Sequence, residues 1–227
     1  KKTVTADTED NAKLIYKKFT LVSLETPSAV ELRVGTPQGT DLLTKLRNRQ
    51  QKKNIRVDLE IKAPSALPIS ILLGPEKKLK LTAWRGKINI TGRKSAVEMS
   101  KLRSTFPLNV NCVDCSMLVS ESEFSGSILV SDQKIEIKKS KASPQPILIF
   151  SQKGAISLEN TEGDFQVRSQ SGDVTMDGHT GALQAQTESG KVKVDRFSGD
   201  LDLQTQTGEI NIEALKINNQ IELKNKS

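Results

Sequence analysis

Seven glycines in the C-terminal third of the chain are spaced nine residues apart, and this spacing constrains the fold more than any other feature. They are Gly154, Gly163, Gly172, Gly181, Gly190, Gly199 and Gly208. The second and fourth residues after each glycine are apolar, and such alternation with a period of two is typical of a half-buried strand. Glycine permits a positive-φ or closely packed corner between strands. A fixed period this short indicates a stacked array.

Residues of like character recur every eighteen positions, which sets the predicted length of one coil. Alternate glycines are followed six residues later by Ser169, Thr187 and Thr205. Residues one coil apart in a solenoid lie about 4.8 Å from each other, so stacking like on like favours two nine-residue strands per coil. We therefore predict an all-β fold, a parallel β-solenoid (β-helix or β-roll) with roughly eighteen residues per coil.

Apolar pairs extend this array upstream, so that the predicted solenoid spans residues 67–227. Their spacing varies from seven to twelve residues, which predicts bulged corners and small insertions. The upstream pairs are Ile69/Ile71, Leu79/Leu81, Ile88/Ile90, Val97/Met99, Leu108/Val110, Met117/Val119, Ile128/Val130, Ile135/Ile137 and Ile147/Ile149.

The segment before the solenoid has a different pattern. Residues 1–18 are polar and are expected to form an N-terminal tail. Alternation predicts strands over 19–25 and 29–35, and Thr40 is a suitable N-cap for a short helix over 40–54. A further strand begins at Ile55 and ends at a proline. We expect residues 19–66 to cap the first coil, because an uncovered strand edge promotes aggregation.

Composition and charge agree with a narrow solenoid. Hydrophobic residues make up 35% of the chain and aromatic residues 4%, which is little for a conventional globular core. No run of eighteen apolar residues predicts a membrane-spanning helix. The net charge is +10 over residues 1–100 and −5 over residues 154–227. The chain starts without methionine or an apolar leader, so a form from which a signal peptide was removed is expected.

The tandem units resemble a bacterial adhesin-like domain family of unknown function. The resemblance covers roughly residues 55–223 and rests on the strand IRVDLEIKAP followed by the units EGDFQV, SGDVTM, TGALQA, SGKVKV, SGDLDL and TGEINI. The glycines thin out over residues 100–150, where the chain departs from the family pattern. The resemblance implies a β-solenoid outside the cytoplasm, and it supplies no catalytic residues.

The two cysteines, Cys112 and Cys115, are expected to be structural. A redox C-x-x-C lies at a helix N-terminus, whereas strands flank this one. The repeat places Cys112 at a small inward position and Cys115 at a glycine corner. There the two cysteines are either small buried residues or joined to each other in a disulfide. A structural zinc site needs four ligands, and the chain has two cysteines and one histidine.

The remaining polar candidates also favour structural roles. His179 occupies the position that Phe197 fills one coil later, so we expect it to pack rather than to catalyse. Asp177, Asp195 and Glu213 are predicted to stack into an acidic column, which Lys193, Arg196 or a calcium ion would balance. The basic stretch Lys45–Arg56 lacks interleaved aromatic residues, so no nucleic-acid partner is expected. No metal or cofactor is predicted.

These patterns favour a non-enzymatic, extracytoplasmic bacterial module, periplasmic, secreted or on the cell surface. It would be an interaction or adhesin-like module that presents its stacked surface to an unknown protein or to the envelope. One alternative is a polysaccharide-binding or polysaccharide-active β-helix, against which the short coils and the single Trp argue. A second alternative is an envelope scaffold that assembles by end-to-end self-association.

Overall fold

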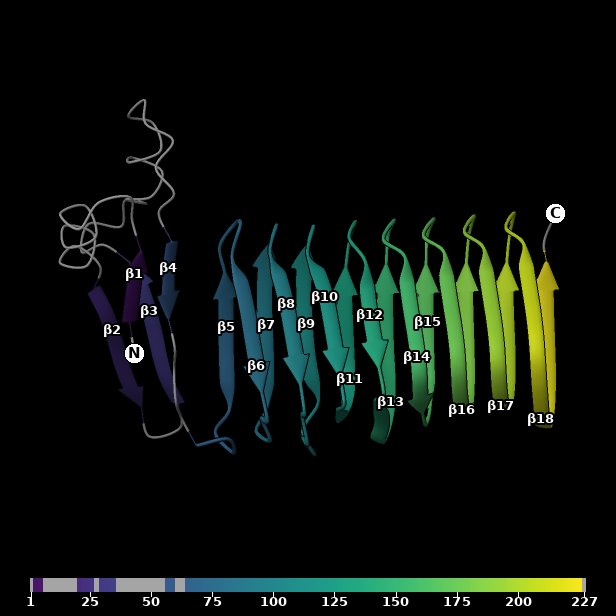
Figure 1. The fold of residues 1–227 in the computed structure, drawn as a ribbon, viewed down its shortest axis with the longest axis horizontal. Coiled ribbons are helices and arrows are strands. Elements are labelled where there is room, and N and C mark those ends of the chain that lie inside the picture. Colours follow the sequence, from purple (N-terminus) through teal and green to yellow (C-terminus); the bar gives the residue numbers. More distant parts are fainter. Residues whose placement is uncertain (1, 6–19, 27–28, 36–55, 60–63, 226–227) are drawn as a thin grey trace, which may run out of the picture. The chain divides into compact units, whose positions relative to one another are not determined.

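The computed structural model describes residues 2–5, 20–26, 29–35, 56–59 and 64–225 (Figure 1). Contacts between residues divide the chain into two compact units, Lys1–Pro64 and Ser65–Ser227. All described elements of both units are β-strands.

Two antiparallel strand pairs form the described part of the first unit. β1 (Lys2–Thr5) pairs with β4 (Arg56–Leu59), and β2 (Thr20–Thr26) pairs with β3 (Ala29–Gly35). The strand β1 lies within the predicted tail over residues 1–18, where the β-branched residues of the segment KTVT suit a strand. The helix predicted over residues 40–54 lies outside the described residues.

The second unit contains the strands β5 to β18, which follow one another along the chain without an intervening helix. Their bounds are β5 (Ile69–Leu73), β6 (Lys78–Thr82), β7 (Ile88–Arg93), β8 (Ala96–Ser100), β9 (Leu108–Val113), β10 (Ser116–Ser120), β11 (Glu123–Val130), β12 (Ile135–Lys138), β13 (Lys141–Ser151), β14 (Ile156–Glu162), β15 (Phe165–Ser169), β16 (Val174–Thr187), β17 (Val192–Thr205) and β18 (Ile210–Asn225).

These strands form a two-faced parallel β-solenoid, as predicted (Figure 1). We call face A the row made by β5, β7, β9, β11, β13, β15 and the second halves of β16, β17 and β18. Face B is the row made by β6, β8, β10, β12, β14 and the first halves of β16, β17 and β18. Every pairing along both rows is parallel, so each strand lies beside the strands one coil earlier and one coil later.

The coil length is eighteen residues at most steps from β14 onward, increases to twenty between Leu201 and Ile221, and is longer at some upstream steps. Val174 pairs with Val192, and Val192 with Ile210, each eighteen residues apart. Ile88 pairs with Leu108 twenty residues later. The register also shifts between Phe124 and Gly126, where β13 carries extra residues opposite β11. Small insertions at the corners therefore explain the irregular spacing of the upstream apolar pairs.

The core is a stripe of mainly aliphatic side chains between the two faces. The predicted inward pairs from Ile88/Ile90 to Leu201/Leu203 are buried. Ile69, Ile71 and Leu79 at the first coil are only partly buried against this core. Each fully buried aliphatic side chain stabilises the fold by about 1.5–3 kcal/mol relative to an exposed one.

Buried hydroxyl groups satisfy the backbone at the corners that follow face A. The amide of Gly172 donates to Ser169 Oγ at 2.9 Å, and the amide of Gly190 donates to Thr187 Oγ1 at 3.0 Å. Gly208 makes the same bond to Thr205 Oγ1 at 2.9 Å. An unpaired buried amide is costly, so the hydroxyl repeated every eighteen residues removes that cost at each coil. This accounts for the predicted stacking of like residues.

The repeated glycines serve two different structural needs. Gly181 adopts a φ of +135°, which L-residues with side chains rarely adopt. Gly190 does not have a positive φ, and its need for glycine is steric instead. A Cβ built on Gly190 would lie 2.3 Å from the carbonyl oxygen of Gly172 one coil earlier. Of the two reasons for glycine that the repeat offered, close packing between coils and not a positive φ therefore applies at this corner.

We predict that Gly190→Val lowers the free energy of unfolding by more than about 1 kcal/mol, because overpacking a rigid backbone contact typically costs that much or more. Urea denaturation measures the effect. Lys191→Val is the matched control, since the same side chain is added at an exposed neighbouring position and should change stability by less than about 0.5 kcal/mol. Equal stability of Gly190→Val and the wild type would contradict the close-contact explanation.

Candidate functional site: the corners and outer faces of the solenoid

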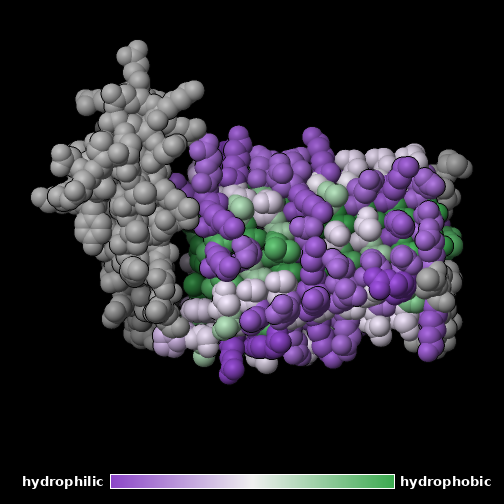
Figure 2. Space-filling view, in the orientation of Figure 1, coloured by the Kyte–Doolittle hydropathy of each residue, from purple (hydrophilic) through white to green (hydrophobic). Residues whose placement is uncertain are grey.

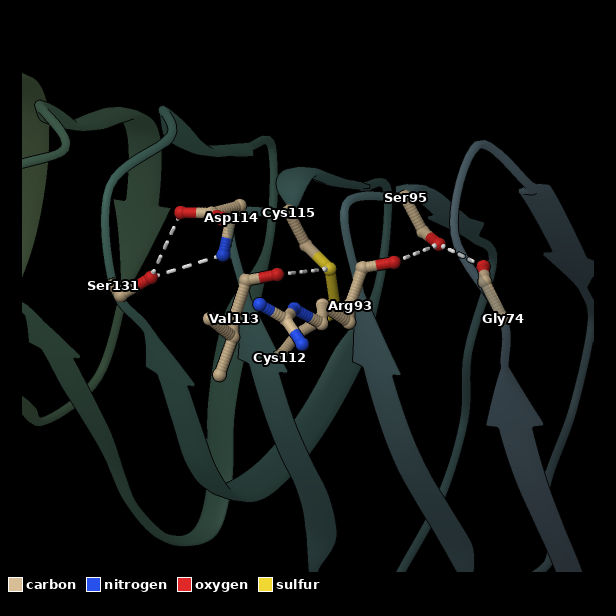
Figure 3. The surroundings of a disulfide bond; sticks show 8 residues. All are labelled: Gly74, Arg93, Ser95, Cys112, Val113, Asp114, Cys115 and Ser131. Carbon is tan, nitrogen blue, oxygen red and sulfur yellow. Dashed lines mark hydrogen bonds between the residues drawn. A yellow bond between two sulfur atoms is a disulfide. The ribbon is translucent and has the colours of Figure 1, made fainter.

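The paired cysteines lie at the corner between β9 and β10, and the structure joins them in a disulfide with a Cα–Cα distance of 5.6 Å (Figure 3). Cys112 points inward and is 1% exposed, and Cys115 is fully buried. Cys112 stands beside Gly92 of the previous coil, where a Cβ on that glycine would lie 2.8 Å from the Cys112 sulfur. Cys112 and Gly92 are therefore tightly packed against each other on successive coils.

Hydrogen bonds tie the disulfide corner to its neighbouring coils (Figure 3). The Lys94 amide donates to the carbonyl oxygen of Val113 at 2.8 Å, and the Asp114 amide donates to Ser131 Oγ at 2.9 Å. Because both sulfurs are buried and the corner is cross-linked on both sides, the geometry suits a structural disulfide. A dithiol that exchanges with substrates needs an exposed, electropositive surrounding instead.

His179 packs inside the solenoid at the other corner. Its ring is 1% exposed and pairs in register with Phe197, at a ring-centroid distance of 5.5 Å. Phe165 contacts it edge-on at 5.4 Å. Its Nδ1 lies 2.9 Å from Thr161 Oγ1. Burial lowers the pKa of His179 from 6.5 to about 4, so the ring is neutral at pH 7. The predicted packing position is confirmed.

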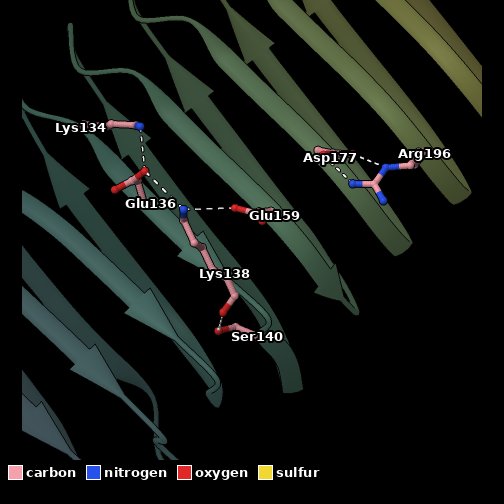
Figure 4. Close-up of polar contacts among 7 residues, drawn as sticks. All are labelled: Lys134, Glu136, Lys138, Ser140, Glu159, Asp177 and Arg196. Atoms are coloured by element: carbon pink, nitrogen blue, oxygen red, sulfur yellow. Dashed lines mark hydrogen bonds and ion pairs between the residues drawn. The ribbon is translucent and has the colours of Figure 1, made fainter.

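The acidic column on face B is also confirmed by the register. Asp177, Asp195 and Glu213 stack in that order, and Glu159 precedes them on the coil before. Two nitrogens of Arg196 contact the two oxygens of Asp177 at 2.6 Å, which lowers the pKa of that carboxyl group (Figure 4).

Cations at the edges of the column balance its charge. Lys138 Nζ lies 3.2 Å from Glu159 at the end of the column nearer the N-terminus (Figure 4). Among the residues that the structure describes, no group of three or more His, Cys, Asp or Glu side chains is arranged to hold a metal ion. Protein cations therefore accompany these carboxylates.

Face B carries most of the ion pairs of the described solenoid. Lys78 and Lys80 both contact Glu98, at 3.2 Å and 3.3 Å. Farther along, Lys134 Nζ lies 2.8 Å from Glu136 Oε1. Exposed pairs of this kind contribute little stability individually, so their main effect is to keep face B highly hydrated. In the view of Figure 2, hydrophilic side chains cover most of the solenoid surface that faces the viewer.

The first three strands of face A carry mainly uncharged side chains on their outer surface, in contrast to the ion pairs of face B. The central outward positions of its first three strands hold Ser70, Leu72, Asn89, Thr91, Asn109 and Asn111. Asn109 Nδ2 donates to Asn89 Oδ1 at 3.2 Å, and Ser127 Oγ donates to Asn109 Oδ1 at 3.3 Å. An uncharged ladder of amides and hydroxyls thus runs from coil to coil. The column of Gln166, Gln184 and Asp202 continues it, with Gln184 Nε2 donating to Asp202 Oδ2 at 3.0 Å.

Three large apolar side chains interrupt this ladder, and we call them the apolar cluster. Leu129, Leu148 and Phe150 are 41%, 46% and 39% exposed on the outside of β11 and β13. Leu129 is the direct register partner of Phe150. The repeat pattern did not predict this cluster. A signal was nevertheless present in the run ILIF (147–150), because a strand that is apolar at four successive positions exposes two of them.

Positive side chains gather at the first two coils. Between residues 64 and 100 the chain has seven Lys and Arg residues against two Glu residues, and all seven are exposed. Lys77, Lys78 and Lys94 line a shallow depression together with Glu76 and Asp114. No described segment forms a helix of the length and hydrophobicity required to cross a bilayer.

Comparison with known families agrees with the fold. Residues 117–227, slightly less than half of the chain, match the model of the Toastrack DUF4097 family. No curated protein and no solved structure matched the chain. The match covers the regular part of the repeat from β10 onward. It supports a β-solenoid domain of unknown function over these coils.

For the disulfide, we predict that the double substitution Cys112→Ala/Cys115→Ala lowers the free energy of unfolding by no more than about 2 kcal/mol, because the loop it closes is very short. Urea denaturation with and without dithiothreitol measures this, and the reductant should not affect the double variant. The wild type should not reduce insulin disulfides. Insulin reduction that is lost in the double variant would contradict a structural role.

For His179, we predict a loss of stability in acid. The folded-state pKa lies near 4 and the unfolded value near 6.5, so the unfolded chain binds the proton first as the pH falls. This term lowers the free energy of unfolding between about pH 6.5 and pH 4, by up to about 3 kcal/mol. His179→Phe removes the term and retains ring packing against Phe165 and Phe197.

Denaturation curves at pH 7, 5 and 4 test this prediction. Carboxylates such as Asp177 also lose stability as they protonate, so the quantity to compare is the stability difference between wild type and His179→Phe at each pH. That difference should grow in favour of the variant as the pH falls. A difference that is constant from pH 7 to pH 4 would show that His179 titrates normally.

Proposed function

We propose that this chain is a non-enzymatic, adhesin-like interaction module that works outside the cytoplasm and binds an anionic surface through its first two coils. The observation that carries the proposal is the reversal of charge along the solenoid. Residues 64–100 carry a net charge of +5, whereas residues 154–227 carry −5. A uniform solvated surface would not separate the signs in this way.

The basic side chains are placed to reach a surface. Lys77, Arg85, Lys87, Arg93 and Lys94 are all exposed in the first two coils. Each lysine or arginine near an anionic membrane contributes about 1 kcal/mol of attraction, which decays within a Debye length. Several such residues on one end of a rigid solenoid therefore give a binding site that is specific for charge and sensitive to salt.

The inside of the solenoid supports a binding role over a catalytic one. Its described core is filled with aliphatic and aromatic side chains, and the single histidine is buried and neutral. The depression at Lys77 and Lys94 is shallow, whereas sites for small molecules usually enclose their ligand. The functional groups of this molecule are thus those on its outer surface.

The disulfide supports a location outside the cytoplasm. Cys112 and Cys115 are bonded to each other in the structure. Disulfides persist in oxidising compartments such as the periplasm and the cell surface, and they are rare in the cytosol. The resemblance of the tandem units to an adhesin-like family favours the same location.

Co-sedimentation with phospholipid vesicles tests the proposal. The full chain should bind vesicles that contain phosphatidylglycerol at low salt and lose most of that binding at high salt, and it should not bind pure phosphatidylcholine. The variant Lys77→Glu/Lys94→Glu should bind at least about thirtyfold more weakly, since two favourable contacts are removed and two repulsive ones are added.

The matched control reverses two charges at the acidic end. Lys191→Glu/Lys193→Glu makes the same chemical change on exposed lysines, and its binding should fall far less. Equal losses in the two variants would show that net charge, and not the first two coils, determines binding. Binding that is insensitive to salt in the wild type would exclude the proposed electrostatic mechanism.

A further inference from the structure

From β5 to the second half of β16, the two central outward positions of the face A strands are almost free of charge, although 27% of the chain is charged. Arg168 is the only ionisable residue at these positions over that range. The last two coils add Asp202, Glu222 and Lys224 at these positions. Face B has Lys80, Glu98, Glu136 and Asp177 at its corresponding positions. A neutral face can lose its water at a much lower cost than a face of ion pairs.

The apolar cluster lies near the middle of this neutral face. Counted along the solenoid from β5, β11 and β13 are the fourth and fifth strands of face A, and four more strand segments follow. Leu129, Leu148 and Phe150 therefore have amide- and hydroxyl-bearing coils on both sides. Interfaces between proteins have this arrangement, with an apolar centre inside a polar rim.

We propose that two copies of this chain associate through face A, around a two-fold axis that lies between the two stacked faces, parallel to the strands and midway between β11 and β13. A two-fold axis brings the same surface of both copies together, so the surface must be complementary to itself. Amides and hydroxyls meet this condition because each group both donates and accepts hydrogen bonds. The sheets would stack about 10 Å apart, as sheets do in β-sandwiches.

The axis determines which residues meet. It places Leu129 of one copy against Phe150 of the other, and Leu148 against Ser127. Asn111 of one copy then faces Arg168 of the other. The carboxylate Asp202 falls opposite Ser70 of the first strand. The arrangement thus buries the apolar cluster against the same cluster of the second copy and brings no two like charges together.

The available area fits a reversible dimer. A face of about five residues by eight coils measures about 16 Å by 38 Å, which gives about 600 Å² per copy. The total of about 1,200 Å² lies at the lower end of specific interfaces. The dimer should therefore form and dissociate in the micromolar range of concentration.

This inference goes beyond the proposed function and can fail independently of it. The surface-binding lysines lie in the first two coils, whereas the dimer depends on the cluster of β11 and β13. Loss of vesicle binding in the Lys77/Lys94 variant leaves the dimer intact, and loss of the dimer leaves vesicle binding by each copy intact.

Sedimentation equilibrium of the full chain tests the dimer, over about a hundredfold range of concentration around the micromolar range. The wild type should change from monomer to dimer. Leu148→Lys should weaken association at least about tenfold, because it places a charge in the desolvated centre. The matched control is Leu118→Lys, the same change on face B between Glu98 and Glu136, which should dimerise as the wild type does.

Three results would overturn the proposal: a wild type that is monomeric throughout, dimerisation of Leu148→Lys equal to that of the wild type, and an equal loss in Leu118→Lys. A monomer whose face A instead binds a soluble polysaccharide also overturns it. Thermal melts establish that each variant is folded. Asn111→Lys provides a second variant, which should weaken the dimer because the new lysine meets Arg168 of the second copy.

A mixing experiment tests the two-fold arrangement itself. Leu129→Glu and Phe150→Lys should each dimerise poorly alone. Mixed, they should form a heterodimer, because the carboxylate introduced at position 129 of one copy meets the ammonium group introduced at position 150 of the other, while the second contact retains Phe150 and Leu129. Recovery of dimer in the mixture, and in neither variant alone, supports the proposed pairing. Failure of the mixture to recover shows that these positions do not meet, and the proposal is then wrong.

Discussion

The parallel hydrogen-bond ladder between successive coils is the constraint on which the rest of this structure depends. It holds the backbones at the spacing of a β-sheet, about 4.8 Å, so every residue stacks on residues one coil before and after it. Any chemical group that occurs once per coil becomes a column. The aliphatic core, the corner hydroxyls and the acidic column on face B all arise in this way.

Stacking identical groups in columns also has costs, namely buried unpaired amides, repulsion between like charges and close contact between backbones. Residues at the corners offset the first two of these costs, and glycine accommodates the third. A buried amide at each corner is satisfied by a hydroxyl three residues earlier, as with Thr187 and Gly190. Carboxylates stacked in a column repel one another, and Arg196 reaches back to the carboxylate of Asp177 to offset that repulsion. The backbone approaches so closely at Gly190 that a side chain there would meet the carbonyl of the previous coil.

Much of this fold could be predicted from the sequence because the repeat is strict where the coils are regular. The spacing of nine, the hydroxyl that recurs from Ser169 to Thr187, and the alternation of apolar residues fix two strands per coil without any long-range information. The apolar cluster was missed for a physical reason. Alternation identifies which residues point inward, such as Ile147 and Ile149, but an outward apolar residue has no periodic signature of its own. At position 190 the repeat left open whether glycine serves a positive φ or a closely packed corner, since contact between coils cannot be read from a local pattern.

The eighteen-residue repeat has one more consequence, for how the chain finds its correct pairing as it folds. A strand displaced by one whole coil would still place aliphatic residues inside and hydroxyls at the corners, so the regular coils alone distinguish weakly between the native pairing and a slipped one. The irregular features remove that ambiguity. The longer steps around β9 and β13, the single disulfide and the ring column of Phe165, His179 and Phe197 each fit at one position only. Departures from the repeat therefore specify the native register of strand pairing, and a perfectly uniform solenoid would not specify it.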